Sequence, residues 1–367
     1  MKLVVFGLSV SSSWGNGHAV LWRALIRALV SGGHFVVFFE RDVPWYAQHR
    51  DLTEIEGGRL VLYGAWDEVR LVARRELADA DAAMVTSYCP DGIEATELVL
   101  EAPGQHVFYD LDTPVTLARL AAGEPLEAIG PRRLAPFDLV LSYTGGGALT
   151  ALTERLGARR VAPLYGSVDP ERYQPATPPS ESRAALSYLG TYAADRQDAV
   201  DGLLLEPARQ RSDLRFVIGG AQYPQDFAWT DNIFFWRHVA RFDHPRFYAA
   251  ARATLNVTRR AMAASGWCPS GRLFEAAACA APVVSDWWDG LDAFFVPERE
   301  ILIVRTTKDV LAALDLSDAE IDRIGEAAHA RVLADHTAGR RADELIGLLS
   351  TPTGIAPNRH PAAPMEA

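Results

Sequence analysis

The sequence has few cysteines, almost no lysine and no long apolar run. Its three cysteines, Cys89, Cys268 and Cys279, form no CxxC pair, which argues against a structural zinc site and favours a reducing, cytoplasmic location. No apolar run reaches the roughly 18 residues that a membrane span needs, and the apolar start lacks the length and cleavage site of a signal peptide. Lys2 and Lys308 are the only lysines. We attribute this to codon bias and therefore weigh an arginine as functional only within a motif.

The chain is acidic, and it is longer than a typical domain with a single hydrophobic core. Its net charge of −11 argues against general affinity for nucleic acid or anionic lipid. A length of 367 residues predicts two domains. The chain begins with a predicted strand at 2–8, a small-residue loop at 9–17, a helix at 19–30 and a strand at 35–39, the first unit of a doubly wound sheet. Further strands are predicted at 60–63, 82–86, 106–109 and 139–141.

The same pattern restarts after a polar, proline-rich segment at 166–179, which we interpret as a linker. Strands are then predicted at 185–189, 216–218, 233–236, 254–257 and 301–304, a helix at 199–209, and further helices between 307 and 349. We therefore expect an α/β protein with two Rossmann-like domains that face each other across a crevice. The predicted boundaries are 1–170 and 180–330, with a C-terminal helix at 331–349 and a disordered tail at 350–367.

The most informative stretch is SGWCPSGRLFEAAACAAPVVSD at 265–286. Ser270 and Gly271 follow a proline and begin a predicted helix, and Pro282 separates that helix from a short buried strand. The start of such a helix offers backbone N–H groups and a partial positive charge, which suit a diphosphate. Glu275 lies about one turn further along and could reach a ribose or sugar hydroxyl. This arrangement is typical of a site for a nucleotide-activated sugar.

Two further segments of the second domain could contact the same ligand. Gly190 and Thr191 end a predicted strand, and Arg196 follows six residues after the glycine. A bend with a nearby guanidinium suits a diphosphate, although a solvated surface arginine is an equally good interpretation. The segment that contains Val239 follows another strand and could bind a nucleobase through main-chain groups.

Two loops of the first domain could bind an acceptor. The first contains Gly15, Asn16, Gly17 and His18. It has the form GxG without the full GxGxxG, so a plain strand–helix turn is the alternative. In the second loop, Asp110 or Asp112 could act as a general base or stabilise a cationic sugar, although capping of the next helix by Asp112 or Thr113 is as good an interpretation. The two aspartates also have the DxD form of metal-dependent sugar transferases, which is weak evidence for a metal.

Together these segments resemble the CgeB-type (spore maturation protein-like) glycosyltransferases of the GT-B fold, over residues 1–349. The resemblance is carried by FGLSVSSSWGNGHA, FYDLDTP, YLGTY, LNVTR and PSGRLFEAAACAAPVVSD, in this order along the chain. It implies a nucleotide diphosphate-sugar donor on the second domain and a small-molecule or glycan acceptor on the first. It implies no cofactor and no metal, because helix ends and basic side chains offset the charge of the leaving diphosphate. A sugar-nucleotide epimerase and a non-catalytic nucleotide-sugar-binding protein are the alternatives on the same scaffold.

The resemblance also implies roles for individual residues. Glu275 looks like the glutamate that hydrogen-bonds the ribose in related family 4 transferases. Ser270, Gly271 and Arg272 would meet the diphosphate, with Arg196 as a side-chain partner. Trp267 stands where relatives often carry a second glutamate for the donor sugar, so the donor sugar and the retaining or inverting outcome stay open.

Overall fold

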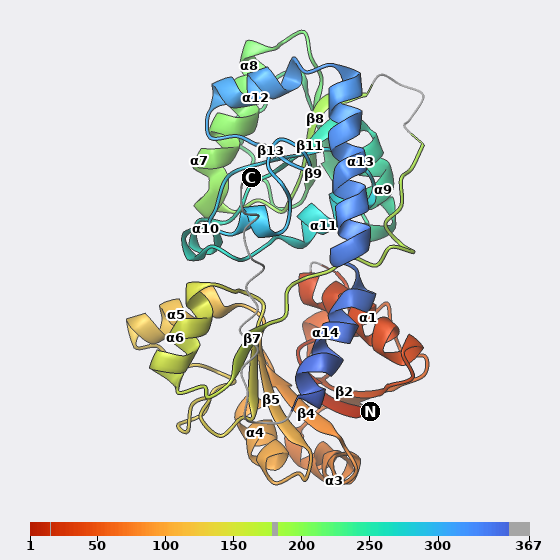
Figure 1. Ribbon diagram of the computed structural model, residues 1–367, viewed down its shortest axis with the longest axis vertical. Helices are drawn as coiled ribbons and strands as arrows, with labels where there is room; N and C mark the ends of the chain where they lie inside the picture. Colours follow the sequence, from red (N-terminus) through yellow and green to blue (C-terminus); the bar gives the residue numbers. More distant parts are fainter. Residues whose placement is uncertain (15, 178–182, 352–367) are drawn as a thin grey trace, which may run out of the picture. The chain divides into compact units, whose positions relative to one another are not determined.

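The structure is a computed structural model that describes residues 1–14, 16–177 and 183–351. The chain forms two compact units (Figure 1). The first contains Met1–Tyr165 and the chain from Gly339 onward, and the second contains Gly166–Ala338. Each unit is built on one parallel sheet with helices on both of its faces, which confirms the predicted α/β class with two Rossmann-like domains.

The first unit has a seven-stranded sheet in the order β3-β2-β1-β4-β5-β6-β7. Its strands are β1 (Lys2–Gly7), β2 (Phe35–Arg41), β3 (Arg59–Tyr63), β4 (Ala82–Thr86), β5 (Gln105–Asp110), β6 (Leu139–Ser142) and β7 (Val161–Pro163). Its helices are α1 (Gly17–Ser31), α2 (Pro44–Ala47), α3 (Trp66–Leu77), α4 (Gly92–Leu100), α5 (Thr113–Ala122), α6 (Gly147–Leu156) and α14 (Ala338–Ser350). All neighbouring strands of this sheet are parallel, so their carboxyl ends lie at one edge.

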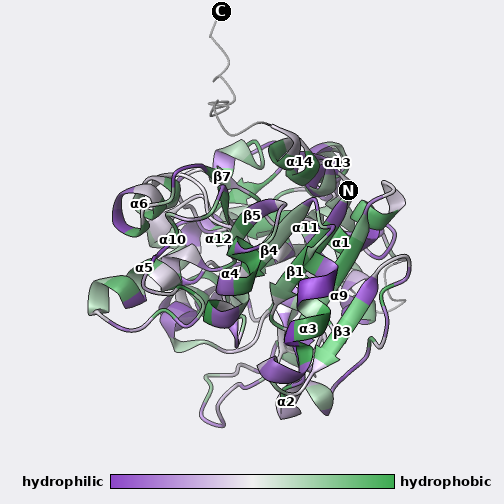
Figure 2. Ribbon diagram, turned by 90° about the horizontal axis from the view of Figure 1, so that it is seen from below, coloured by the Kyte–Doolittle hydropathy of each residue, from purple (hydrophilic) through white to green (hydrophobic). Residues whose placement is uncertain are grey.

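Both faces of this sheet are buried. Successive residues of a strand point to opposite faces, and β1 shows this directly. Val4 and Phe6 pack in a core with residues of α3, α4 and α6, whereas Leu3 and Val5 pack in a second core with residues of α1 and α14. The strands are consequently almost continuous in apolar residues, as the green of β1, β4 and β5 in Figure 2 shows.

The second unit has a six-stranded parallel sheet in the order β10-β9-β8-β11-β12-β13. Its strands are β8 (Ala184–Leu189), β9 (Phe216–Gly220), β10 (Ile233–Arg237), β11 (Ala251–Asn256), β12 (Val283–Ser285) and β13 (Leu302–Ile303). Its helices are α7 (Gln197–Val200), α8 (Glu206–Gln210), α9 (His244–Ala249), α10 (Arg260–Ser265), α11 (Gly271–Ala278), α12 (Thr307–Leu314) and α13 (Asp318–Asp335). Helices α7, α8 and α12 lie on one side of the sheet, and α9, α11 and α13 on the other (Figure 1).

The boundaries between the two units differ from the predicted domain boundaries. The units divide between Tyr165 and Gly166, and α13 belongs wholly to the second unit. The predicted C-terminal helix at 331–349 is instead the end of α13 followed by α14, which packs on the first unit through Ala342, Leu345 and Leu349. Val168 and Ala338 lie where the chain enters and leaves the second unit, and a backbone hydrogen bond of 2.9 Å joins them. Helix α14 reaches Ser350, the first residue of the predicted tail at 350–367, and the part of that tail from 352 lies outside the described residues.

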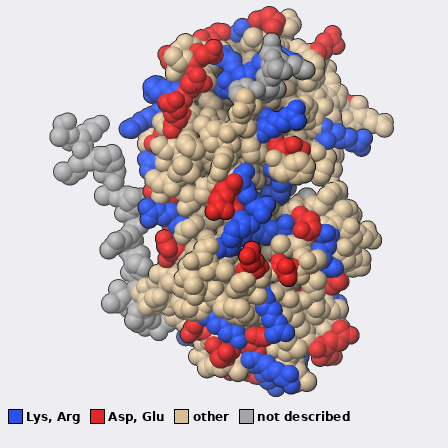
Figure 3. Space-filling model, turned by 90° about the vertical axis from the view of Figure 1, so that its right-hand side faces the viewer, with Lys and Arg blue, Asp and Glu red and all other residues tan. Residues whose placement is uncertain are grey.

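The charged side chains are mostly interspersed. Acidic and basic side chains lie close to one another on the face shown in Figure 3. Many charged side chains of the protein form ion pairs, such as Arg132 with Glu97 and Arg252 with Asp318. Within the part of the chain that the structure describes, no helix combines the length and apolar character that crossing a membrane requires.

Candidate functional site

The carboxyl edge of the second sheet is tightly packed where β8 and β9 end. The N–H of Gly190 donates to the carbonyl of Gly219 at 2.8 Å. Gly220 has a φ of 151°, and a Cβ there would lie 2.0 Å from the carbonyl oxygen of Gly190. Only glycine allows this approach of the two backbones. Ligands of open α/β sheets bind at this edge, so the predicted Gly190–Thr191 bend lies where a ligand would be expected.

Helix α11 begins at the predicted position. Ser270 is its N-cap, with extended backbone, and its Oγ accepts from the N–H of Arg272 at 3.4 Å. A Cβ built at Gly271 would meet no atom within 4 Å, so there is open space beside the first turn. The first turn of a helix has N–H groups without partners in the helix, together with a partial positive charge.

Two guanidinium groups lie close to this region. Arg272 donates through Nη1 to the carbonyl of Leu189, and Arg196 donates through Nη2 to the carbonyl of Thr191. The Cζ atoms of both arginines lie 5.9 Å from the ring centre of Tyr188. The two positive charges therefore flank one aromatic ring at the end of β8.

The positive charge of Arg196 is only partly compensated within the protein. Burial lowers the pKa of Arg196, and the positive charges of Arg272 and Arg259 lower it further. The Nε of Arg196 is buried and has no hydrogen-bond partner. By contrast, Arg259 forms an ion pair with Asp195 at 3.0 Å. A bound anion would relieve the unfavourable charge at Arg196, which is the behaviour expected of a phosphate-binding arginine.

Glu275 is buried inside the second unit, with 9% of its surface exposed. Tyr173 donates to its Oε1 at 3.1 Å, and His244 and Tyr248 lie 3.3 and 3.5 Å from its Oε2. Although burial alone would raise it, the pKa of Glu275 is held below its ordinary value by the hydrogen bond and charge of His244 and by the charge of Arg241. The carboxylate thus connects α11 to α9. A ribose hydroxyl would have to join or replace one of these partners.

Trp267 is held rigidly before α11. Its φ is 49°, a left-handed backbone that non-glycine residues rarely adopt and that is often found at functional sites. Its N–H donates to the carbonyl of Asp289 at 2.7 Å. A Cβ at Gly290 would lie 2.4 Å from the indole ring, so the ring rests against the glycine backbone. The sequence did not indicate this contact.

The segment with Val239 continues the edge beyond β9. The N–H of His238 donates to the carbonyl of Gly220 at 2.8 Å. A Cβ at Gly219 would lie 2.8 Å from Cγ2 of Val239, so Val239 packs directly over this glycine. Its contact with a nucleobase stays a prediction.

In the first unit, Asn16 organises the start of α1. Its Oδ1 accepts from the N–H groups of His18 and Ala19 at 3.1 and 3.3 Å, and its Nδ2 donates to the carbonyls of Ser9 and Ser12. These contacts are those of a strand–helix turn with an N-cap. Gly17 has open space beside it, and Gly15 lies outside the described residues.

His18, Tyr88 and Asp112 lie next to one another at the carboxyl edge of the first sheet. The rings of His18 and Tyr88 meet edge to face at 5.4 Å, and Tyr88 donates its hydroxyl to Oδ2 of Asp112 at 3.0 Å. Burial lowers the pKa of His18, and its Nδ1 is buried without a hydrogen-bond partner. Tyr88 has a φ of 67°, a further uncommon conformation at this edge.

Asp110 is fully buried, with 0% exposure. Its Oδ1 accepts from the hydroxyl of Thr116 at 3.0 Å and from the N–H of Asp112 at 3.2 Å. Burial raises the pKa of Asp110 to about 6 in spite of these hydrogen bonds. Asp112 occupies the N-cap position of α5, but its side chain makes no cap hydrogen bond. The predicted side-chain cap by Asp112 is therefore not formed, and the hydroxyl of Thr113 lies 2.7 Å from that of Ser142.

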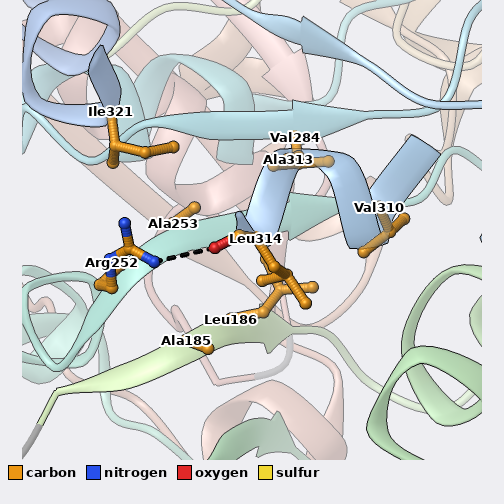
Figure 4. Close-up of a pocket in the computed structure, with 9 residues that line it drawn as sticks. All are labelled: Ala185, Leu186, Arg252, Ala253, Val284, Val310, Ala313, Leu314 and Ile321. Carbon is orange, nitrogen blue, oxygen red and sulfur yellow. Dashed lines mark hydrogen bonds between the residues drawn. The ribbon is translucent and has the colours of Figure 1, made fainter. Parts of the chain in front are cut away.

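A small cavity of about 30 Å³ lies beside α5. Tyr88 and Thr116 line it, together with Arg119 and Glu127, which form an ion pair at 3.3 Å. Tyr88 donates to Asp112 and Thr116 donates to Asp110, so two lining residues contact the predicted catalytic residues, which do not line the cavity themselves. A second cavity, in the second unit, has a different character (Figure 4). It is apolar, holds about 10 Å³, and is lined by β8, β11 and α12, with Arg252 donating to the carbonyl of Leu314 at 3.1 Å. It has room for at most one water molecule.

Solved structures share this architecture over nearly the whole chain. Sucrose-phosphate synthase from Thermosynechococcus elongatus is 15% identical with a TM-score of 0.68, covering 95% of this chain and 98% of that one. Anabaena HepE in complex with UDP-glucose is 14% identical with a TM-score of 0.66, covering 95% and 99%. The trehalose-6-phosphate synthase OtsA is 12% identical with a TM-score of 0.65, covering 96% and 99%. The fold is the GT-B fold.

Sequence comparison adds information on the second unit of this GT-B protein. Residues 196–347 match the model of a family described as glycosyl transferase-like. This stretch contains Arg196, Val239, Ser270, Arg272 and Glu275, so most of the predicted donor residues lie within it. No curated protein sequence matches the chain.

The GT-B units bring most of the predicted residues together within each unit. Gly190, Thr191, Arg196 and Arg272 meet at the end of β8, and His18 approaches Asp112 through Tyr88. The DxD motif does not present two accessible carboxylates, because Asp110 is fully buried. Within the residues that the structure describes, no group of three or more His, Cys, Asp or Glu side chains is placed to hold a metal ion.

The sequence did not identify several partners in these clusters. They are Tyr88, Tyr173, Tyr188, Arg241, His244 and Tyr248. Each contacts a residue far away in sequence, as Tyr173 does with Glu275 across 102 positions. Only His244 had a local signal, since it follows a strand and precedes a proline.

Proposed function

We propose that the chain is a glycosyltransferase of the hexosyltransferase type, which transfers a sugar from a nucleotide diphosphate-sugar to an acceptor hydroxyl. The observation that carries the proposal is the pair Arg196 and Arg272, which flanks Tyr188 beside the open first turn of α11. The positive charge of Arg196 is incompletely compensated. The match of residues 196–347 to a glycosyl transferase-like family supports the same activity.

The chemistry follows from where charge develops. When the bond between the sugar and the diphosphate breaks, negative charge grows on the leaving phosphate oxygens. Donors that are already oriented toward that charge stabilise the transition state without rearrangement. Arg196, Arg272 and the N–H groups at Gly271 supply such donors in the second unit. We propose that they replace a metal ion in offsetting the charge.

We propose that the first unit supplies the acceptor side of the reaction. Asp112 is the better candidate for a base that removes the acceptor proton, because Asp110 is fully buried and engaged by Thr116. Tyr88 orients Asp112 through its hydroxyl. A general base must lie within hydrogen-bond reach of the proton that it removes, so the acceptor hydroxyl would have to approach the carboxylate of Asp112 directly.

The donor nucleotide proposed for first testing is UDP. The HepE structure contains UDP-glucose, which supports this choice through the shared fold. We also propose that the chain belongs to the CgeB-type branch of the GT-B proteins, because its motifs resemble those of that branch. We also propose a cytoplasmic location, since all three cysteines are buried free thiols.

The test measures UDP binding and UDP release. Replacing Arg272 or Arg196 by Ala should raise the Kd for UDP about tenfold to a hundredfold, because each removes a charged hydrogen-bond donor to phosphate. Arg260→Ala is the matched control, since this exposed arginine pairs with Asp198. Calorimetry gives the Kd, and UDP release from UDP-glucose with acceptor panels gives the activity.

The outcomes separate the alternatives. UDP binding that both arginine variants retain at full strength would refute the proposed donor site. Conversion of the nucleotide-sugar without any acceptor would identify an epimerase. Tight UDP binding with no release of UDP in the presence of any acceptor would identify a non-catalytic binding protein.

A further inference from the structure

Two exposed tryptophans lie together at the carboxyl edge of the first sheet. Trp14 lies in the loop after β1 and Trp45 in α2 after β2, with exposures of 40% and 56%. Their ring centres are 5.2 Å apart at an angle of 69°. His49 stacks on Trp14 at 4.4 Å and 20°. Clustered exposed aromatic rings of this kind mark binding sites more often than single ones.

The backbone beneath this aromatic cluster is fixed by buried or half-buried carboxylates. Asp51 accepts from the N–H of Ser13 at 3.0 Å and forms an ion pair with Arg23. Although burial opposes it, the hydrogen bonds from Arg23 and Ser13 lower the pKa of Asp51 to about 2. Glu40 accepts from the N–H and Oγ of Ser11 at 2.9 and 2.6 Å. The cluster is therefore held in position before any ligand arrives, which reduces the entropy cost of binding.

The chemistry of the cluster suits a sugar ring. A pyranose presents a face of C–H groups that stacks on an aromatic ring, and its hydroxyls at the rim bind planar charged side chains. Arg50 and Asp42, which form an ion pair, supply such groups near Ser11 and β2. A protein partner would need a much larger continuous apolar surface. Phe35, the other exposed aromatic residue of this part of the sheet, begins β2 and so lies at the opposite edge.

The position of the cluster indicates which ring of a substrate it would bind. In the sheet order, two strand spacings separate β1 from β5 and three separate β2 from β5. These spacings amount to about 10 and 14 Å, more than the extent of one sugar ring. Asp112 follows β5, and the rings of His18 and Tyr88 lie between. The strand order thus places the tryptophans, the rings of His18 and Tyr88, and Asp112 one after another along this edge.

We propose that Trp14 and Trp45 bind a pyranose ring of an oligosaccharide acceptor, at least one unit away from the sugar that presents its hydroxyl to Asp112. The proposal rests on the proposed glycosyltransferase function, because that function makes Asp112 the reacting end. It assigns the acceptor to the class of oligosaccharides rather than to small molecules.

The test compares the full-length protein with single variants. Trp45→Ala and Trp14→Ala should each weaken binding of an oligosaccharide of four units about tenfold, the scale of one lost aromatic contact. Binding of the corresponding monosaccharide and of UDP should not change. Phe35→Ala is the matched control, with 43% exposure at the other edge. A glycan array selects the tetrasaccharide, calorimetry gives the Kd, and Trp45→Tyr should restore most of the affinity.

Unchanged tetrasaccharide affinity in both tryptophan variants would overturn the proposal. So would a wild-type protein that binds no oligosaccharide on the array. If UDP binding and UDP release persist in that case, the proposed function stands and only the acceptor assignment fails. If UDP does not bind either, the proposed function fails as well.

Discussion

At the residue scale, Asp110 combines complete burial with an ionisable group. Its pKa of about 6, against an ordinary value of 3.8, means that the folded protein retains a proton that the unfolded chain has released between these pH values. Stability should therefore fall as pH rises from 3.8 to 6 and stay lowered above. The substitution Asp110→Asn should remove this loss of stability, because the Asn side chain does not titrate. The free energy of unfolding of the variant, relative to wild type, should rise by ~2 kcal/mol between pH 4 and pH 7.

Urea unfolding at a series of pH values measures this difference. Asp343→Asn serves as the control, because Asp343 is exposed on α14. A constant difference between Asp110→Asn and wild type across the range would contradict the assignment of a raised pKa.

Glu275 shows how far the sequence could predict the site. The motif placed it on α11, one turn after Ser270, and the structure has it there. The same motif gave no sign of Tyr173 or Tyr248, because their contacts with the carboxylate are made by folding, not by local pattern. The positions of Ser270 and Gly271 were predictable since a helix start has a local signal. The approach of Arg196 and Arg272 to the ring of Tyr188 was not predictable, because no local pattern signals it.

At the scale of elements, α14 is the clearest case of a helix that stabilises a distant part of the chain. Leu345 is buried in the same core as β1 and α1 of the first unit. Leu345→Ala should lower the free energy of unfolding of this unit by ~3 kcal/mol, because it removes buried methyl groups and leaves a cavity. Asp343→Ala on the exposed face of α14 should change it by less than about 0.5 kcal/mol.

Urea unfolding followed by circular dichroism checks this pair of variants. Equal effects of the two substitutions would show that α14 does not contribute its apolar face to the core.

The elements with strong local patterns were predicted well. Strand β4 has the predicted bounds, Ala82–Thr86, because five apolar or β-branched residues form a continuous buried run. The predicted helix at 199–209 is interrupted by a π-helical turn at Asp201–Leu205, just before Pro207, which has no N–H for the helix ladder. Strand β7 (Val161–Pro163) was missed, because three residues ending in proline carry no strand period.

At the scale of the whole molecule, the two units should respond differently to ligand. The proposed donor groups, Arg196 and Arg272, belong to the second unit. Saturating UDP at a hundred times its Kd should stabilise that unit by about 2.7 kcal/mol. In scanning calorimetry, this should raise its transition by about 5–10 °C and leave the transition of the first unit unchanged.

The Leu345→Ala variant shows which calorimetric transition belongs to the first unit, because it should lower the temperature of that transition. If UDP instead raised the transition that Leu345→Ala lowers and no other, the nucleotide would bind to the first unit.

The route of the chain imposes an order on biosynthesis. Residues that emerge early from the ribosome, up to Tyr165, lack the helix that closes one of their two cores until synthesis has passed residue 345. The intervening segment begins and ends at one place, where Val168 and Ala338 are hydrogen-bonded. It can therefore fold as an inserted domain before the fold of the earlier segment is completed. The nascent N-terminal half consequently exposes apolar surface throughout that interval and becomes a natural client for chaperones.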